Sequence, residues 1–122
     1  MTALTLADFL RARLGEDEAV ARAAAVDQWG YEVGSREGFQ WASLVLSAER
    51  DTSPEQDEFI DRHTPARVLA DVEAKRRIVD EATNYTPELE HGDNGEWAFD
   101  VTLRLLALPH ASHPDYRNEW RP

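Results

Sequence analysis

The sequence predicts a small, mainly helical domain of the α+β class, with three to four helices and one β-hairpin. Three stretches carry apolar residues at helical spacing, and one stretch alternates apolar and polar residues around a glycine-containing turn. The chain has 122 residues, 42% of them hydrophobic, which is enough to build one core without metals or disulfides. We therefore expect a single domain over residues 1–122.

The first helix is expected over residues 5–25. Thr5 is a suitable N-cap because its hydroxyl can accept a hydrogen bond from a backbone N–H of the first turn. Apolar residues then recur at helical spacing, and they are Leu6, Phe9, Leu10 and Leu14. Gly15 costs roughly 1 kcal/mol relative to alanine within a helix, so a bend or a break at this point stays open.

Residues 29–47 are expected to form the β-hairpin. Apolar residues alternate with polar ones on both sides of a turn at residues 34–38, and they are Trp29, Tyr31, Val33, Phe39, Trp41 and Val45. A hairpin alone is marginally stable in water, so its aromatic face should pack on the helices. A helix over residues 39–48 is the open alternative.

Thr64 and Pro65 mark the clearest helix start in the chain. Threonine suits the N-cap and proline suits the first helical position, so a capped helix is expected over residues 64–83. Residues 51–63 before it form an acidic segment, and residues 84–95 after it form an acidic loop. We interpret both acidic stretches as solvated linkers, or as a recognition surface.

Residues 96–108 are expected to form the central buried helix. One apolar stripe holds Trp97, Val101, Leu105 and Leu108, and another side holds Phe99, Leu103 and Leu106, which leaves little polar surface. Pro109 ends this helix, and residues 109–122 form a proline-bounded tail. Most aromatic residues should pack in the core, whereas Tyr116 and Trp120 near the end of the tail are expected to be the most exposed pair.

Composition excludes several classes of function. The chain has no cysteine, so thiol chemistry, disulfides and cysteine-based zinc sites are impossible. Its net charge of −11 opposes direct binding to nucleic acid, because phosphates repel carboxylates. No stretch approaches the roughly 20 apolar residues that cross a bilayer, and no signal peptide opens the sequence, so we expect a cytoplasmic protein that does not bind membranes.

The negative charge is concentrated in two segments. Residues 51–63 carry five acidic residues and one arginine, and residues 84–101 carry five acidic residues and no base. Such a surface could steer a basic protein or imitate the phosphates that a DNA-binding protein recognises. The candidate partner-binding residues are Asp51, Glu55, Asp57, Glu58, Glu88, Glu90, His91, Asp93, Glu96, Tyr116 and Trp120.

Four histidines are the groups that could support acid-base or metal chemistry, namely His63, His91, His110 and His113. Of these, His91, His110 and His113 are weak candidates for metal ligands. The carboxylates around His91 could serve a hard cation, although the EF-hand pattern fails there. Phosphate-binding loops and common hydrolase motifs are absent from the sequence, so we expect neither a metal nor another cofactor.

Residues 63–79 and 103–120, together with the opening helix, resemble an uncharacterised family of short acidic actinobacterial and actinophage proteins, which is a domain of unknown function. The resemblance implies no activity. Relatives commonly have aspartate at position 64 and tyrosine at position 110, where this chain has Thr64 and His110. The resemblance also implies cysteines, and a small metal knuckle, between residues 84 and 100 of relatives, where this chain has carboxylates and His91.

These observations predict a non-enzymatic binding or regulatory protein that acts on a protein partner through an acidic surface. Its origin would be a phage or another mobile element. Two alternatives stay open: a small metal-dependent hydrolase that uses histidines and carboxylates, and a virion or structural component.

Overall fold

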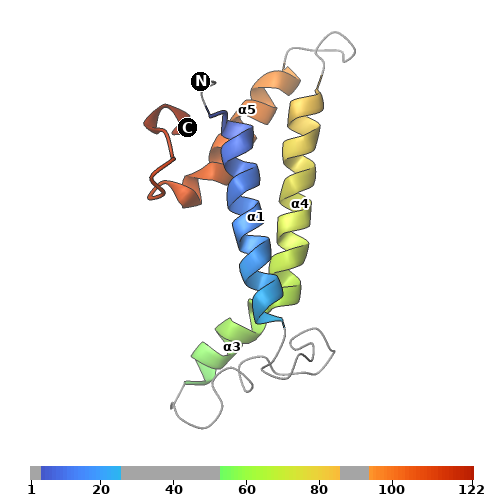
Figure 1. Ribbon diagram of the computed structural model, residues 1–122, viewed down its shortest axis with the longest axis vertical. Helices are drawn as coiled ribbons and strands as arrows, with labels where there is room; N and C mark the ends of the chain where they lie inside the picture. Colours follow the sequence, from blue (N-terminus) through green and yellow to red (C-terminus); the bar gives the residue numbers. More distant parts are fainter. Residues whose placement is uncertain (1–3, 26–52, 86–93) are drawn as a thin grey trace. The chain divides into compact units, whose positions relative to one another are not determined.

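The computed structural model describes residues 4–25, 53–85 and 94–122, and all regular structure in these ranges is helical (Figure 1). The helices are α1 (Leu6–Ala24), α3 (Pro54–Arg62), α4 (Pro65–Asn84) and α5 (Asn94–Ala107), followed by the 3-10 turns η1 (Leu108–His110) and η2 (Asn118–Trp120). No described helix has the length and apolar character required to cross a membrane.

The predicted α+β class is therefore wrong, although its mainly helical part is confirmed. Helices account for 81% of the described residues, and no strand occurs among them. The hairpin expected over residues 29–47 lies outside the described residues, so the class now follows from the helices alone. Alternation over a few residues on each side of a turn was the sole basis for a β element, and it is a weaker signal than long helical periodicity with caps.

Residues Met1–Glu16 and Glu73–Pro122 form one compact unit, and Asp17–Val72 form a second. We call them the terminal unit and the central unit. Helices α1 and α4 each contribute residues to both units. The single domain expected from the sequence stays a prediction, which the cooperativity of unfolding would test.

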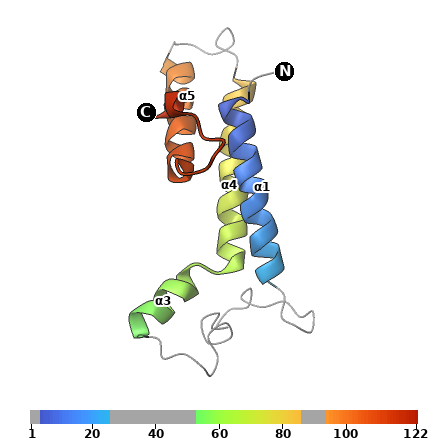
Figure 2. The same ribbon diagram turned by 60° about the vertical axis from the view of Figure 1, so that its left-hand side comes forward.

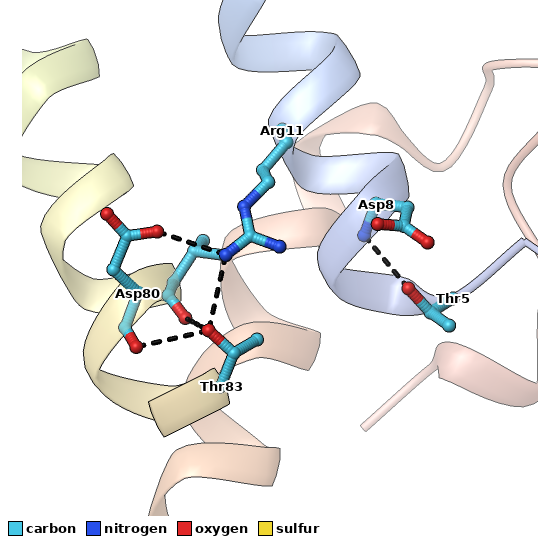
Figure 3. A network of polar contacts seen from close by, with 6 residues as sticks. Thr5, Asp8, Arg11, Asp80 and Thr83 are labelled. Carbon is cyan, nitrogen blue, oxygen red and sulfur yellow. Dashed lines mark hydrogen bonds and ion pairs between the residues drawn. The ribbon is translucent and has the colours of Figure 1, made fainter. Parts of the chain in front are cut away.

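Helix α1 begins where the sequence predicts it. The Asp8 N–H donates to the Thr5 hydroxyl at 3.0 Å, so Thr5 is the N-cap (Figure 3). The helix continues through Gly15 without a break, because one glycine costs less than the packing of the turns around it. In the terminal unit α1 runs beside α4 (Figures 1 and 2), where Leu10, Leu14 and Val79 are buried.

Helix α4 also begins as predicted. The Arg67 N–H donates to the Thr64 hydroxyl at 3.2 Å, and Pro65 occupies the first helical position, where its missing N–H costs nothing. In the central unit Pro65, Val72 and Ala21 are buried.

Within the acidic segment 51–63, the described residues Pro54–Arg62 form helix α3 rather than a linker. Ser53 caps α3, accepting a hydrogen bond from the Gln56 N–H at 3.2 Å. The Gln56 side chain accepts in return from the Ser53 N–H at 3.0 Å, which completes a capping box. Pro54 follows the cap at the first helical position.

Candidate protein-interaction surfaces

Helix α3 is acidic and has no buried side, because none of its nine residues is buried. Glu55, Glu58, Phe59 and Arg62 recur at i, i+3, i+4 and i+7 and therefore share one face. All four are exposed, and Phe59 exposes 63% of its surface. We call these four residues the α3 outer face. It combines two carboxylates with an exposed aromatic ring and one guanidinium, and of these the aromatic ring and the arginine are residue types enriched in protein-binding surfaces.

The α3 outer face is held in place at the end of the helix. His63 is the C-cap, and its Nδ1 lies 2.7 Å from the Phe59 carbonyl oxygen. A carbonyl only accepts, so Nδ1 carries the proton of this hydrogen bond. The His63 ring also stacks on the Phe59 ring, with centroids 4.3 Å apart. Arg62 donates to Glu58 at 2.7 Å on the same face. These contacts fix the Phe59 ring beside the carboxylates.

A second exposed surface lies on α5 in the terminal unit. Trp97 exposes 68% of its surface and Leu105 exposes 53%, while Leu103 and Ala107 on the opposite side of the helix are buried. The helix expected over residues 96–108 is present as α5, but its predicted burial on all sides is wrong. Helix α5 is amphipathic and buries only its Leu103 side, because one helix packed on one side of a small unit has solvent on the other.

Tyr116 and Trp120 do not form the exposed pair that the sequence predicts. Trp120 exposes only 6% of its surface, and Tyr116 is half-buried with a buried hydroxyl. Both rings pack against Phe9, with centroid distances of 5.9 Å and 5.1 Å for Tyr116 and Trp120 respectively. The tail folds back because these rings bury large apolar areas. Binding a partner needs accessible side chains, so we do not propose Tyr116 and Trp120 as partner-binding residues.

The two histidines of the tail belong to the same aromatic cluster. His110 and His113 lie edge-on to Phe9, at centroid distances of 6.3 Å and 5.7 Å. His113 Nδ1 accepts a hydrogen bond from the Asp115 N–H at 3.0 Å, so that nitrogen is occupied within the turn. Among the described residues, no group of three or more histidines and carboxylates is placed to hold a metal ion.

The remaining acidic candidates divide into two groups. Glu96 is exposed in the first turn of α5, and Asp57 is half-buried on α3. The other predicted site residues lie outside the described residues, and they are Asp51, Glu88, Glu90, His91 and Asp93. The structure therefore brings together Glu55 and Glu58, and it places Glu96 in the other compact unit.

Sequence reasoning missed the apolar members of both surfaces. The charge of the acidic segment favours a linker and hides Phe59, although the Ser53 to Gln56 spacing and Pro54 together signal a capped helix. The two apolar stripes of α5 predict a core position for Trp97 and Leu105, because periodicity alone does not show which stripe faces solvent.

No curated protein and no solved structure matches this chain significantly. One family model matches residues 3–122, almost the whole chain, and it is described as a family of unknown function (DUF6221). The chain therefore belongs to the DUF6221 family.

Proposed function

We propose that this protein is a non-enzymatic binding or regulatory protein whose α3 outer face binds a basic protein partner in the cytoplasm. The observation that carries the proposal is an acidic helix with no buried residue that nevertheless keeps an aromatic ring in solvent. A capping box and a stacked histidine hold this helix, so its form does not depend on a buried side of its own. An exposed helix ordered in this way is suited to binding.

Charge supports a basic partner. Helix α3 carries four carboxylates and one guanidinium, and the whole chain carries 24 acidic against 13 basic residues. A basic protein would be steered towards this face, and the steering would weaken as salt screens the charges over roughly 10 Å at 0.1 M. A DNA-binding protein is one partner of this kind, since a row of carboxylates imitates phosphates, and any cationic patch with an apolar pocket for Phe59 satisfies the geometry.

We further propose a phage or mobile-element origin in a GC-rich actinobacterial host. Twelve of the 13 basic residues are arginine, and alanine is abundant, as GC-rich codons favour. The two alternative functions, a metal-dependent hydrolase and a virion component, have no described feature in their favour.

A pull-down from a GC-rich bacterial lysate tests the proposal. The immobilised chain should capture a basic protein at about 0.05 M salt and release it at about 0.5 M salt. The variant Glu55→Gln/Glu58→Gln should lose the capture, because it removes two charges from the α3 outer face. The matched control Glu73→Gln/Glu81→Gln removes two exposed charges from α4 and should retain it. Equal capture by both variants, or the absence of any salt-sensitive partner, would contradict the proposal.

A further inference from the structure

The outward side of α5 is an apolar stripe that the structure leaves in solvent. Its members are Trp97, Val101 and Leu105 of α5 and Leu108 at the start of the adjoining turn η1, spaced by four, four and three residues. Trp97, Leu105 and Leu108 expose 68%, 53% and 36% of their surfaces, and Val101 is half-exposed. We call these residues the α5 stripe. A stripe at this spacing is the pattern that helices use to pack against other helices.

The residues along one border of the α5 stripe carry both signs of charge. Asp100 and Arg104 lie one turn apart on that border, with Arg104 Nε donating to Asp100 at 2.9 Å. Arg104 also donates to the Glu119 carbonyl oxygen, at 2.6 Å, so its side chain is held at the border. The other border carries the small residues Ala98 and Thr102, which permit close approach of a second helix.

The order of the two charges along α5, Asp100 and then Arg104, determines which kind of helix can pack on the α5 stripe. A uniformly basic helix would meet Arg104, and a uniformly acidic helix would meet Asp100. The complement is a helix with a base followed by an acid in the direction of α5, next to an equivalent apolar stripe. A second copy of α5 in the antiparallel direction has that order.

We propose that the α5 stripe is the interface of a symmetric dimer, in which α5 packs antiparallel against α5 of a second copy. The midpoint of the stripe lies between Val101 and Leu105, so a two-fold axis there places Trp97 against Leu108 of the second copy. The same axis places Asp100 opposite Arg104 of the second copy, and this ion pair occurs twice in the dimer. In a parallel two-fold arrangement the Asp100 and Arg104 border of one copy would instead face the Ala98 and Thr102 border of the other, so these ion pairs would not form.

The dimer is weak and strengthens with salt. One helix face buries less than the roughly 800 Å² per partner of a standard interface, so association depends on concentration. Each copy carries a net charge of −11, and screening of that repulsion favours association of the apolar stripes. Salt acts in the opposite direction on the partner proposed for the α3 outer face. The dimer does not depend on that partner, so failure of one proposal leaves the other intact.

Sedimentation equilibrium of the full chain, from about 10 µM to about 1 mM, tests the dimer. The average mass should rise from 13.8 kDa towards twice that value, and further at higher salt. Leu105→Glu should keep the mass at that of the monomer over the whole range, because it places a charge in the centre of the stripe. Val20→Glu is the matched control: Val20 exposes 70% of its surface on α1, and this variant should associate like the wild type at equal salt.

The charge order is tested by two reversals. Asp100→Arg alone and Arg104→Asp alone should each weaken self-association at least tenfold, and their equimolar mixture should form a heterodimer as strong as the wild-type dimer. Circular dichroism and thermal melts verify that each variant folds. If Arg104→Asp does not fold, Asp100→Arg remains informative, because its own dimer should be weaker at low salt than the wild-type dimer and should recover at high salt.

Three results would overturn the proposal. The first is a wild-type monomer at every concentration and salt. The second is self-association that Leu105→Glu leaves unchanged or that Val20→Glu reduces equally. The third is a mass that rises beyond two copies, or a mixture of the two reversals that stays monomeric, since neither fits a closed antiparallel pair.

Discussion

Arg11 on α1 donates from Nη2 to Asp80 on α4 at 3.0 Å, and thereby joins residues that are 69 positions apart in the sequence (Figure 3). The same nitrogen lies 3.2 Å from the Thr83 hydroxyl, which in turn donates to the Val79 carbonyl oxygen at 3.0 Å. The contact therefore links α1 to the last turns of α4 within the terminal unit.

Removal of this contact should cost little stability. The Arg11 and Asp80 side chains are 44% and 60% exposed, and exposed ion pairs contribute roughly 0.2–1 kcal/mol. Arg11→Met and Asp80→Asn should each lower the free energy of unfolding by less than about 1 kcal/mol, with a coupling energy in that same range. Urea unfolding of the two single variants and the double variant measures it. A coupling above about 2 kcal/mol would contradict the exposed character of the pair.

Gly15→Ala should stabilise the protein. Gly15 lies within α1, and a Cβ built there meets nothing within 4 Å. Alanine would gain about 0.5–1 kcal/mol from the reduced entropy of the unfolded chain, without a steric penalty. Thermal and urea unfolding should both show the gain. A loss of stability would mean that α1 is bent at this glycine, contrary to the observed continuous helix.

Gly95→Ala should have the opposite sign. A Cβ at Gly95 would lie 2.9 Å from Cε2 of Tyr85 and closer still to its Cζ and its hydroxyl oxygen. The Tyr85 ring packs against Phe99 at a centroid distance of 5.3 Å, so it does not yield freely. Overpacking of this kind costs about 1–3 kcal/mol, more than the helix propensity that alanine gains. The same substitution in a Tyr85→Ala background should be neutral or stabilising, which makes the background the control.

Ser53→Ala should loosen α3 selectively. The helix has no buried residue, so the capping box provides a large share of its stability, and loss of an N-cap costs about 0.5–2 kcal/mol. Amide hydrogen exchange should accelerate over residues 54–62 and stay unchanged in α5. Ser53→Asp should retain protection, because aspartate caps equally well. Uniform acceleration across the chain would show that α3 does not unfold independently.

The predictable part of this fold is the part with local physical signals. Thr5 and Thr64 cap their helices as the sequence predicts, because a cap needs only one hydroxyl at the correct position. The burial of Trp120 and the exposure of Trp97 were not predictable in this way. The burial of Trp120 depends on how the tail folds back on Phe9, and the exposure of Trp97 depends on which side of α5 is packed, and neither has a periodic signal in the sequence.

The candidate site shows the same division. Helix α3 was predictable from the spacing of Ser53 and Gln56, a signal that was present but outweighed by the charge of the segment. The side of α5 that meets solvent was not predictable, because Leu105 and Leu103 are both leucines on one helix and only the packing distinguishes them. The side of α5 that is exposed is therefore decided by tertiary packing and not by local sequence.

Arg13 in the terminal unit is a buried arginine whose hydrogen-bond donors are only partly satisfied. Only 9% of its side chain is exposed, and its Nη2 donates to Glu16 at 3.0 Å. Its Nε and Nη1 are buried without a hydrogen-bond partner in the described structure. The guanidinium lies over the Phe9 ring at 5.3 Å, which offsets part of this cost.

Arg13→Met should therefore raise stability. A cation–π contact contributes roughly 0.5–2 kcal/mol, whereas each buried unsatisfied donor costs about 1–3 kcal/mol, so removal of two such donors outweighs the lost contact. Methionine retains the apolar part of the side chain against Phe9. Urea unfolding should show a gain of about 1 kcal/mol. Glu16→Gln, which weakens only the exposed ion pair, is the control and should change stability by less than about 0.5 kcal/mol. A clear loss in Arg13→Met would mean that the guanidinium gains more from Phe9 and Glu16 than its two unpartnered groups cost.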